Sequence, residues 1–216
     1  MVSNVVITLL RHGRTLDNEA SRYSGWVNSK LSHSGRADIL AIKNQYEKEN
    51  TFCNNIDQIY TSDLNRTIET AQLLFQKQFP LQTLKNLREM HFGDFEGLSY
   101  DELKDNHYYQ AWLNNLFTYE LPNGESFTQF TTRIDQSFEL IKKEMLMQNF
   151  KHIVLIVHGG VIRYLLTKLT NDSRSFFDYK VPFAQGYQLK CTQEKLREDK
   201  PCMSLQEVPI MESGTS

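Results

Sequence analysis

The sequence predicts an α/β fold of three layers (α/β/α), in which helices cover both faces of a mainly parallel sheet. Apolar runs at residues 5–10, 56–61 and 152–157 are typical of strands that are buried on both faces. Helical patterns stand between these runs, so strands and helices alternate along the chain. Because crossovers between parallel strands are right-handed, this alternation builds one sheet with helices on both sides.

Four segments show the apolar spacing of amphipathic helices, namely residues 35–49, 63–77, 126–148 and 161–169. The most regular is 126–148, whose apolar stripe consists of Phe127, Phe130, Ile134, Phe138, Ile141 and Met145. For the helix 63–77 we expect Ser62 or Asp63 as the N-cap, because a short polar side chain there can accept from the first free N–H groups.

Length and charge set limits on the organisation and on the partners. The chain has 216 residues, and we expect residues 1–216 to form a single domain. Its 24 Lys and Arg against 26 Asp and Glu give a net charge of −2, without the basic excess of proteins that bind nucleic acid or acidic membranes. No apolar run approaches the ~20 residues of a membrane helix. We therefore expect neither a nucleic-acid nor a membrane partner.

The cysteines and the first residues bear on location and cofactors. Residues 1–4 carry no basic side chain, and Arg11 ends the apolar run that follows, so no secretory signal is predicted. Cys53, Cys191 and Cys202 are odd in number and lack the spacing of metal ligands. We expect reduced thiols in a cytoplasmic protein, with no metal and no other cofactor. The oligomeric state stays open.

Residues 91–125, which we call the excursion, differ from the rest of the chain. They carry eight aromatic side chains and no clear strand. We expect a partly helical segment over the sheet, and two interpretations of it stay open: it serves as a substrate lid, or its aromatic residues form a second packed layer. The chain after Cys191 is polar, and we expect a mobile C-terminal tail beyond Glu207.

Basic side chains stand where the predicted strands end. The first strand leads into Arg11 and His12, the third into His158, and the second into Arg66 at the start of a helix. Ligands of open parallel sheets bind beyond the carboxyl ends of the strands, so these side chains are expected to meet there. Either histidine alone could be a buried structural residue, but the repeated arrangement favours an anion site. Thr15 is expected to cap the helix start that follows.

These residues resemble the histidine phosphatase, or phosphoglycerate mutase-like, superfamily, and the resemblance covers residues 4–190. It is specific because five blocks occur in the order of the family: Leu10-Arg11-His12-Gly13-Arg14-Thr15 with Asn18; Gly25-Trp26 followed by residues 31–35; residues 61–71; residues 87–97; and residues 157–163. The resemblance implies a phosphoglycerate mutase-like fold and a metal-independent phosphatase that acts on a small-molecule phosphate monoester.

The resemblance also implies roles for individual residues. His12 corresponds to the nucleophile that forms a phosphohistidine, and Glu89 to the proton donor. The phosphate pocket maps to Arg11, Asn18, Arg66 and His158, and Gly25 and Trp26 belong to the substrate-binding block. For Glu89 the alternative is a surface carboxylate paired with Arg88; Asp94 and Glu96 are expected to be structural.

General chemistry adds detail to these roles. Two arginines beside His12 lower the pKa of its imidazole, and we hypothesise that a backbone carbonyl keeps its other ring nitrogen protonated. The guanidinium groups can each bind two phosphate oxygens, and His158 and Asn18 can donate to others. For the rest of the substrate, the candidates that could stack on an aromatic group are Trp26, Phe92, Tyr108 and Trp112, and His91 is a further residue that could face it.

Within the superfamily the chain is most similar to the α-ribazole phosphatases of cobalamin (adenosylcobalamin) biosynthesis, through residues 23–25, 89–96 and 122–127. Three alternatives stay open: another small-molecule or broad-specificity histidine phosphatase, a phosphoglycerate mutase, and an inactive module that binds phosphorylated partners. The mutase is disfavoured because Lys104 is the one Lys or Arg of the excursion. The inactive module is disfavoured because the nucleophile, the arginines and the acid are all present.

Some positions depart from the pattern of the family. Arg14 stands where glutamate is commonest, residues 28–30 replace a frequent Asp-x-Pro, Thr67 replaces alanine, and Val157 replaces serine or threonine. None of these changes removes a group to which the resemblance gives a catalytic role. They leave the shape of the pocket and the choice of substrate open.

Overall fold

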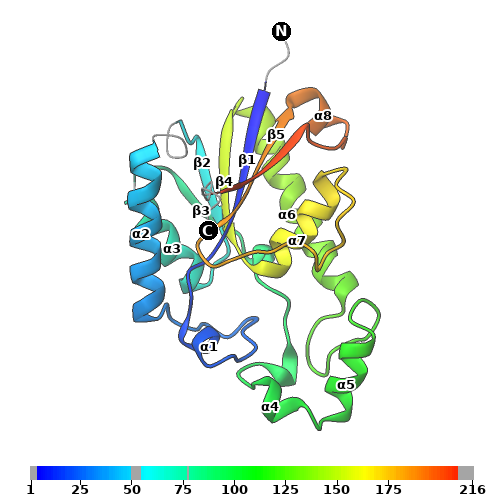
Figure 1. Ribbon diagram of the computed structural model, residues 1–216. Coiled ribbons are helices and arrows are strands. Elements are labelled where there is room, and N and C mark those ends of the chain that lie inside the picture. The colour runs from blue at the N-terminus through cyan, green and yellow to red at the C-terminus, as the bar shows by residue number, and fades with distance from the viewer. Residues whose placement is uncertain (1–3, 50–54, 77, 209–216) are drawn as a thin grey trace, which may run out of the picture.

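The computed structural model describes residues 4–49, 55–76 and 78–208 of the chain (Figure 1). Its described strands form one six-stranded sheet in the order β3-β2-β4-β1-β5-β6. The strands are β1 (Asn4–Arg11), β2 (Gln58–Thr61), β3 (Leu81–Thr83), β4 (His152–Val157), β5 (Gly186–Thr192) and β6 (Ser204–Val208). The four strands β3, β2, β4 and β1 are parallel to one another, and β5 is antiparallel to β1 and to β6. The predicted mainly parallel sheet is therefore confirmed.

Helices cover both faces of this sheet. The helices are α1 (Leu16–Glu19), α2 (His33–Glu49), α3 (Asn65–Phe75), α4 (Tyr100–Leu103), α5 (His107–Asn114), α6 (Phe127–Met147), α7 (Gly159–Leu169) and α8 (Gln193–Arg197). Figure 1 shows α2 and α3 on one side of the sheet and α6, α7 and α8 on the other. Two short 3₁₀ helices, η1 (Lys85–Leu87) and η2 (Gly93–Phe95), precede α4. The three-layer arrangement is the one that the sequence predicts.

Each face of the sheet has its own core, because successive side chains of a strand point to opposite faces. In β4, Val154 and Ile156 pack in the core beneath α2 and α3, whereas Ile153, Leu155 and Val157 pack in the core beneath α6 and α7. All five of these side chains are buried. The five consecutive apolar residues 153–157 are therefore explained by two separate layers of helices.

The predicted strands and helices are present, with shifts at their ends. β4 has the predicted bounds, β1 is one residue longer at each end than 5–10, and β2 starts at Gln58. Helices α2 and α7 begin two residues before the predicted starts, and α6 has Ser126 as N-cap, with a capping box to Gln129. The apolar stripe of α6 is buried at Phe130, Ile134, Phe138, Ile141 and Met145.

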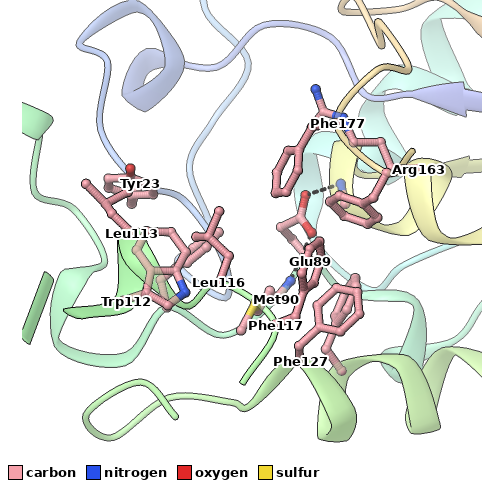
Figure 2. A pocket seen from close by; sticks show the side chains of 14 residues that line it. Tyr23, Glu89, Met90, Trp112, Leu113, Leu116, Phe117, Phe127, Arg163 and Phe177 are labelled. Atoms are coloured by element: carbon pink, nitrogen blue, oxygen red, sulfur yellow. Dashed lines mark hydrogen bonds between the residues drawn. The ribbon is translucent and has the colours of Figure 1, made fainter. Parts of the chain in front are cut away.

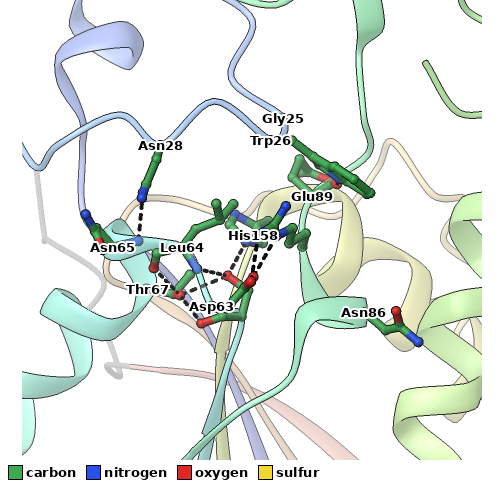
Figure 3. Close-up of polar contacts among 12 residues, drawn as sticks. Gly25, Trp26, Asn28, Asp63, Leu64, Asn65, Thr67, Asn86, Glu89 and His158 are labelled. Carbon is green, nitrogen blue, oxygen red and sulfur yellow. Dashed lines mark hydrogen bonds and ion pairs between the residues drawn. The ribbon is translucent and has the colours of Figure 1, made fainter. Parts of the chain in front are cut away.

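The prediction of the N-cap of α3 is wrong. The N-cap is Leu64, which offers no side-chain hydrogen bond, and α3 starts at Asn65 instead of residue 63. The amide oxygen of Asn28, from a distant loop, accepts from the N–H of Asn65 at 2.8 Å instead (Figure 3). The cap is thus supplied by tertiary structure. The last residue of the predicted helix, Lys77, lies outside the described residues.

The excursion (91–125) is partly helical, as expected, and contains η2, α4 and α5. Its two ends are joined to each other, since Glu125 N donates to His91 O at 2.9 Å and Asp94 N donates to Pro122 O at 3.0 Å. Figure 1 shows α4 and α5 beyond the end of the sheet at which β1 and β4 finish. The excursion therefore lies at the edge where the predicted site residues are located.

The polar C-terminal segment contributes two elements that the sequence did not predict, α8 and β6. β6 pairs with β5 from Gly186↔Val208 to Lys190↔Ser204. The tail expected beyond Glu207 falls, from residue 209 onward, outside the described residues. In the described part of the chain no helix is both long and apolar enough to cross a membrane.

Two glycines of the excursion provide a matched test of its base. Gly93 has φ of 55°, and a Cβ there would lie 2.0 Å from Pro122 O, whereas Gly97 has φ of 77° and open space around a Cβ. We expect Gly93→Ala to lower the free energy of unfolding by about 2–4 kcal/mol, because the backbone must shift. Gly97→Ala is expected to cost only about 1 kcal/mol, for its backbone conformation. Urea unfolding measures both, and equal losses would contradict the tight contact at Gly93.

Candidate active site

His12 follows β1 directly and is almost completely buried, with 5% of its surface exposed. Its N–H donates to Val157 O at 3.0 Å, and its Nδ1 lies 2.7 Å from Gly13 O. Since a carbonyl only accepts, Nδ1 carries the proton, and Nε2 of the neutral ring keeps its lone pair. Burial, with further contributions from Arg66 and Arg11, holds the pKa of His12 well below its usual value. The structure thus contains the carbonyl contact that the sequence analysis hypothesised.

Arg11 ends β1 beside His12. Its Nη1 donates to Val181 O at 2.7 Å, and its guanidinium lies 3.9 Å from the centre of the Phe183 ring. The Nε atom is buried and has no hydrogen-bond partner among the described residues. Burial lowers the pKa of Arg11 to about 10, so the group remains charged at neutral pH. This arginine therefore keeps a donor that a bound anion can use.

Arg66, in the first turn of α3, is completely buried. Its Nη2 donates to Gly25 O at 2.6 Å and to Ser24 O at 3.3 Å, and its Nη1 donates to Val27 O at 2.8 Å. Its Nε donates to Nδ1 of His158 at 3.3 Å. Burial lowers the pKa of Arg66 to about 10. The guanidinium that was expected to bind phosphate thus also fixes loop 24–27 against the end of the sheet.

The contact with Arg66 determines the tautomer of His158. Because Arg66 Nε must donate, Nδ1 of His158 accepts, and the proton of the neutral ring sits on Nε2. Nε2 then donates to Ser62 Oγ at 2.9 Å, and the Ser62 hydroxyl donates to Thr67 Oγ1 at 2.9 Å (Figure 3). Thr67 completes the chain by donating to Leu64 O or Ser62 O, both at 2.9 Å.

This hydrogen-bond chain differs from the expected role of His158. The ring lies close to His12, with 5.2 Å between the two ring centres. Its one N–H is directed at Ser62 Oγ. Burial and the nearby Arg66 hold the pKa of His158 well below its usual value, so the ring stays neutral. In this arrangement His158 orients Arg66.

Glu89 lies at the N-terminus of α7. Its Oε2 accepts from Gly160 N at 2.9 Å and its Oε1 accepts from Met90 N at 3.0 Å. Pairing with Arg88, the alternative considered above, is wrong, because Arg88 forms a two-pronged contact with Asp63 at 2.6 Å. The carboxylate of Glu89 is consequently held by the N–H of Gly160, which follows His158 by two residues in the chain. In this position it interacts electrostatically with Arg11 and Arg66.

Two side chains hold the backbone of Glu89 in place. Trp26 Nε1 donates to Glu89 O at 3.0 Å, and Arg133 Nη2 donates to the same oxygen at 2.7 Å. Arg133, on α6, also forms a partly buried ion pair with Glu125 at 2.6 Å. The sequence analysis did not identify Arg133, because in the sequence it is an ordinary charged residue of a helix. Its contact with Glu89 forms only in the folded chain.

Glu96 anchors the loop that Arg66 contacts. Its carboxylate accepts from Trp26 N at 2.7 Å, Val27 N at 2.6 Å and Phe92 N at 3.2 Å. Asp94 accepts from Asn123 Nδ2 at 3.0 Å. Both carboxylates have the structural roles that the sequence analysis expected.

The remaining predicted residues lie at the margin of this group. Thr15 caps α1 as expected, and Asn18 completes the capping box, because its Oδ1 accepts from Thr15 N at 3.1 Å. Arg14 is exposed and pairs with Asp38 at 3.8 Å. His91 stacks on Trp26, with 4.6 Å between ring centres.

A cavity of about 330 Å³ opens beside Glu89 (Figure 2). It is lined by Tyr23, Glu89, Met90, Phe92, Trp112, Leu113, Leu116, Phe117, Phe127, Phe130, Gly160, Arg163, Phe176 and Phe177. Of the four predicted stacking residues, Phe92 and Trp112 line it, whereas Trp26 and Tyr108 do not. The sequence analysis did not identify Arg163, Phe176 and Phe177 as cavity residues. For the two phenylalanines a signal existed, because they are adjacent in an otherwise polar stretch of the chain.

No group of three or more His, Cys, Asp or Glu side chains among the described residues is arranged to hold a metal ion. The charge of the site comes from its arginines. Its chemistry is that of a neutral imidazole lone pair between two guanidinium groups, with a carboxylate beside it. Such a set can hold a dianion and transfer part of it to nitrogen.

The comparisons with known proteins agree with this geometry. The family model of the histidine phosphatase superfamily (branch 1) matches residues 7–200. A metal-independent phosphoserine phosphatase of Arabidopsis thaliana is 31% identical over 172 residues, covering 77% of this chain and 69% of that protein. The adenosylcobalamin/α-ribazole phosphatase of Escherichia coli (strain K12) is 30% identical over 167 residues, covering 74% of this chain and 77% of that protein.

Solved structures give the same result for the fold. The α-ribazole phosphatase from Shigella flexneri superposes with a TM-score of 0.76 at 26% identity, covering 88% of this chain and 92% of that one. A phosphoglycerate mutase from Bacillus anthracis str. Sterne gives a TM-score of 0.74 at 24% identity, covering 96% of this chain and 93% of that one, and this likeness shows the fold alone. The fold is therefore phosphoglycerate mutase-like.

The two buried histidines predict how stability depends on pH. Both pKa values are lower in the folded protein than the ~6.5 of an unfolded histidine, so below pH 6.5 the unfolded chain takes up protons that the folded one does not. The free energy of unfolding should fall by up to about 1.4 kcal/mol per pH unit and histidine between pH 6.5 and 5. Urea unfolding should give a shallower pH slope for His12→Gln, and an unchanged slope would contradict a neutral buried His12.

Proposed function

Because the chain belongs to the histidine phosphatase superfamily (branch 1) and is a phosphoric monoester hydrolase, we propose that it acts through a phosphohistidine on His12. The observation that carries this proposal is the 2.7 Å contact between His12 Nδ1 and Gly13 O, which leaves Nε2 unprotonated. A buried neutral imidazole is a nucleophile that needs no base to activate it. No metal ion takes part in the proposed reaction.

The reaction has two steps. Nε2 of His12 attacks phosphorus, the bond to the leaving oxygen breaks, and Glu89 gives that oxygen its proton. Glu89 then takes a proton from water, whose oxygen attacks phosphorus while the N–P bond breaks. The second step releases inorganic phosphate and restores the lone pair of Nε2 and the proton of Glu89.

The positive groups stabilise the transferred phosphoryl group. Arg11 offers its unpartnered Nε, and Arg66 retains one Nη1 hydrogen beyond the contacts described above. His158 acts through Arg66, whose Nε it holds. Asn18 supplies its amide N–H groups, since its Oδ1 is already engaged by Thr15. Losing one preorganised donor of this kind costs ~10²–10³ in rate.

For the substrate we propose α-ribazole 5′-phosphate, in which a dimethylbenzimidazole ring is joined to a ribose phosphate. The support is the cavity beside Glu89, on the side from which the leaving oxygen departs, where all lining side chains except Glu89 and Arg163 are apolar or aromatic. The named activity of the Escherichia coli relative agrees with this substrate. The excursion (91–125) forms part of the cavity wall, and we propose that it closes over the bound substrate.

Phosphoserine is the second candidate, because a phosphatase of that name is 31% identical to this chain. Its leaving group is small and zwitterionic, and an aromatic cavity offers it little. The cavity therefore favours the ribazole ester. We further propose a cytoplasmic location, which is supported by the free thiols of Cys191 and Cys202, since structural disulfides are typical of oxidising compartments.

The first test is phosphate release in EDTA from α-ribazole 5′-phosphate, phosphoserine, 3-phosphoglycerate and phenyl phosphate. We expect the ribazole ester to have the highest kcat/KM and EDTA to have no effect. His12→Ala should lower kcat by at least about 10³-fold, because the step that forms the N–P bond is removed. Activity that survives in His12→Ala would overturn the mechanism, and equal turnover of all four esters would overturn the substrate.

A second test uses the two adjacent glycines at the start of α7. A Cβ at Gly160 would lie 2.4 Å from Oε1 of Glu89, whereas at Gly159 the nearest atom, Cζ of Arg11, is 3.6 Å away. Gly160→Ala should displace the Glu89 carboxylate and lower kcat by about 10²-fold, while the fold is retained. Gly159→Ala, the matched control, should stay within about threefold of the parent. Equal activities would contradict the role of Glu89.

A further inference from the structure

The cavity beside Glu89 contains a feature that the proposed reaction does not use. Trp112, on α5, lines the cavity and is 7% exposed. Its Nε1–H is buried and has no acceptor among the described residues. An unpaired buried donor costs about 1–3 kcal/mol, and native proteins satisfy nearly all such groups. The ring nitrogen of Trp112 therefore requires an explanation.

The neighbouring polar groups on the same side of the cavity are paired. The hydroxyls of Tyr23 and Tyr109 bond to each other at 2.7 Å. Trp26, the other tryptophan of the chain, donates its Nε1–H to Glu89 O. The unpaired N–H of Trp112 is thus an exception within a cluster that otherwise satisfies its polar atoms.

The indole of Trp112 is held in place by packing. The indole contacts four aromatic rings, with 5.7 Å between ring centres to Tyr23, 5.9 Å to Phe92, 6.2 Å to Phe95 and 5.8 Å to Tyr109. A second group of rings, Phe117, Phe127, Phe176 and Phe177, forms another part of the lining. Figure 2 shows Trp112 and Leu113 across the cavity from Glu89 and Phe127.

These features define the chemistry of a ligand. Aromatic walls on two sides favour a flat aromatic ring, and about 330 Å³ lies at the small end of the range for small-molecule sites. A donor in the wall calls for an acceptor on that ring. A ring nitrogen that accepts from an N–H must be unprotonated, because a protonated nitrogen has no free lone pair.

We propose that Trp112 selects the leaving group by donating a hydrogen bond from Nε1 to an unprotonated ring nitrogen of an aromatic heterocycle. This inference rests on the proposed function, because it places the heterocycle on the leaving-group side of the phosphate site. It makes Trp112 a specificity-determining residue, with no part in the bond-breaking steps. The benzimidazole of α-ribazole has one such nitrogen, the one that is not bonded to ribose.

The experiment compares ester pairs that differ in one atom. One pair is α-ribazole 5′-phosphate and its analogue with C–H in place of the free ring nitrogen; the other is 6-quinolinyl phosphate and 2-naphthyl phosphate. The parent should favour the nitrogen-containing member of at least one pair by about tenfold in kcat/KM, the value of one hydrogen bond. Trp112→Phe should abolish that preference.

A second variant separates loss of the N–H donor from loss of packing at position 112. Benzothienylalanine at position 112 keeps the bicyclic shape and replaces N–H by sulfur, so it should also abolish the preference. The inference is overturned if the parent shows no preference in either pair, or if both variants keep it. Failure of the proposed function is distinct: it appears as activity in His12→Ala, or as turnover of the aryl esters without turnover of the ribazole ester.

Discussion

The buried guanidinium of Arg66 is the constraint on which the rest of the site depends. A charge with no exposed surface is stable only when its donors are all directed at acceptors. Three carbonyls of loop 24–27 and one ring nitrogen of His158 accept from four of its five N–H groups, and the fifth remains for a bound phosphate. The same contacts that satisfy the charge position the loop and determine which nitrogen of His158 carries the proton.

Two further layers of contacts follow from this arrangement. Loop 24–27 is held from the other side by Glu96, and Trp26 from this loop fixes the carbonyl of Glu89. His158 donates a hydrogen bond to Ser62, which contacts Thr67 of α3, and so couples α3 to the start of α7. Thr67, which stands where the family most often has alanine, extends that chain by one hydroxyl. The nucleophile, the arginines and the carboxylate are therefore positioned by one connected network.

The sequence was sufficient for the parts of the fold that repeat a pattern. β1 and β4 are apolar at nearly every position because both of their faces are covered, and the stripe of α6 is regular over its whole length. β5 and β6 were missed because they lie at one side of the sheet and carry polar residues such as Gln188 and Lys190. Their pairing depends on partners far away in the chain, which periodicity does not report.

The site residues also divide into those that the sequence pattern predicts and those that depend on partners far away in the chain. Arg11, His12 and His158 were predictable because they follow buried strands, whose ends meet by topology. Ser62 was expected to be a cap because it precedes a helix, but its hydroxyl accepts from His158, and Asn28 caps α3 from another loop. The cavity walls combine the excursion, the start of α6 and the loop before β5. Such combinations exist only once the chain has folded.

The closed ends of the excursion (91–125) bear on how such enzymes diversify. Because His91 O and Glu125 N, and Asp94 N and Pro122 O, are joined directly, the segment leaves and re-enters the body of the protein at almost one point. Insertions or deletions between those bonds do not shift the register of any strand. The part of the segment between Gly97 and Leu121 can therefore vary with the leaving group, provided that Glu96 and Glu125 remain to hold loop 24–27 and Arg133.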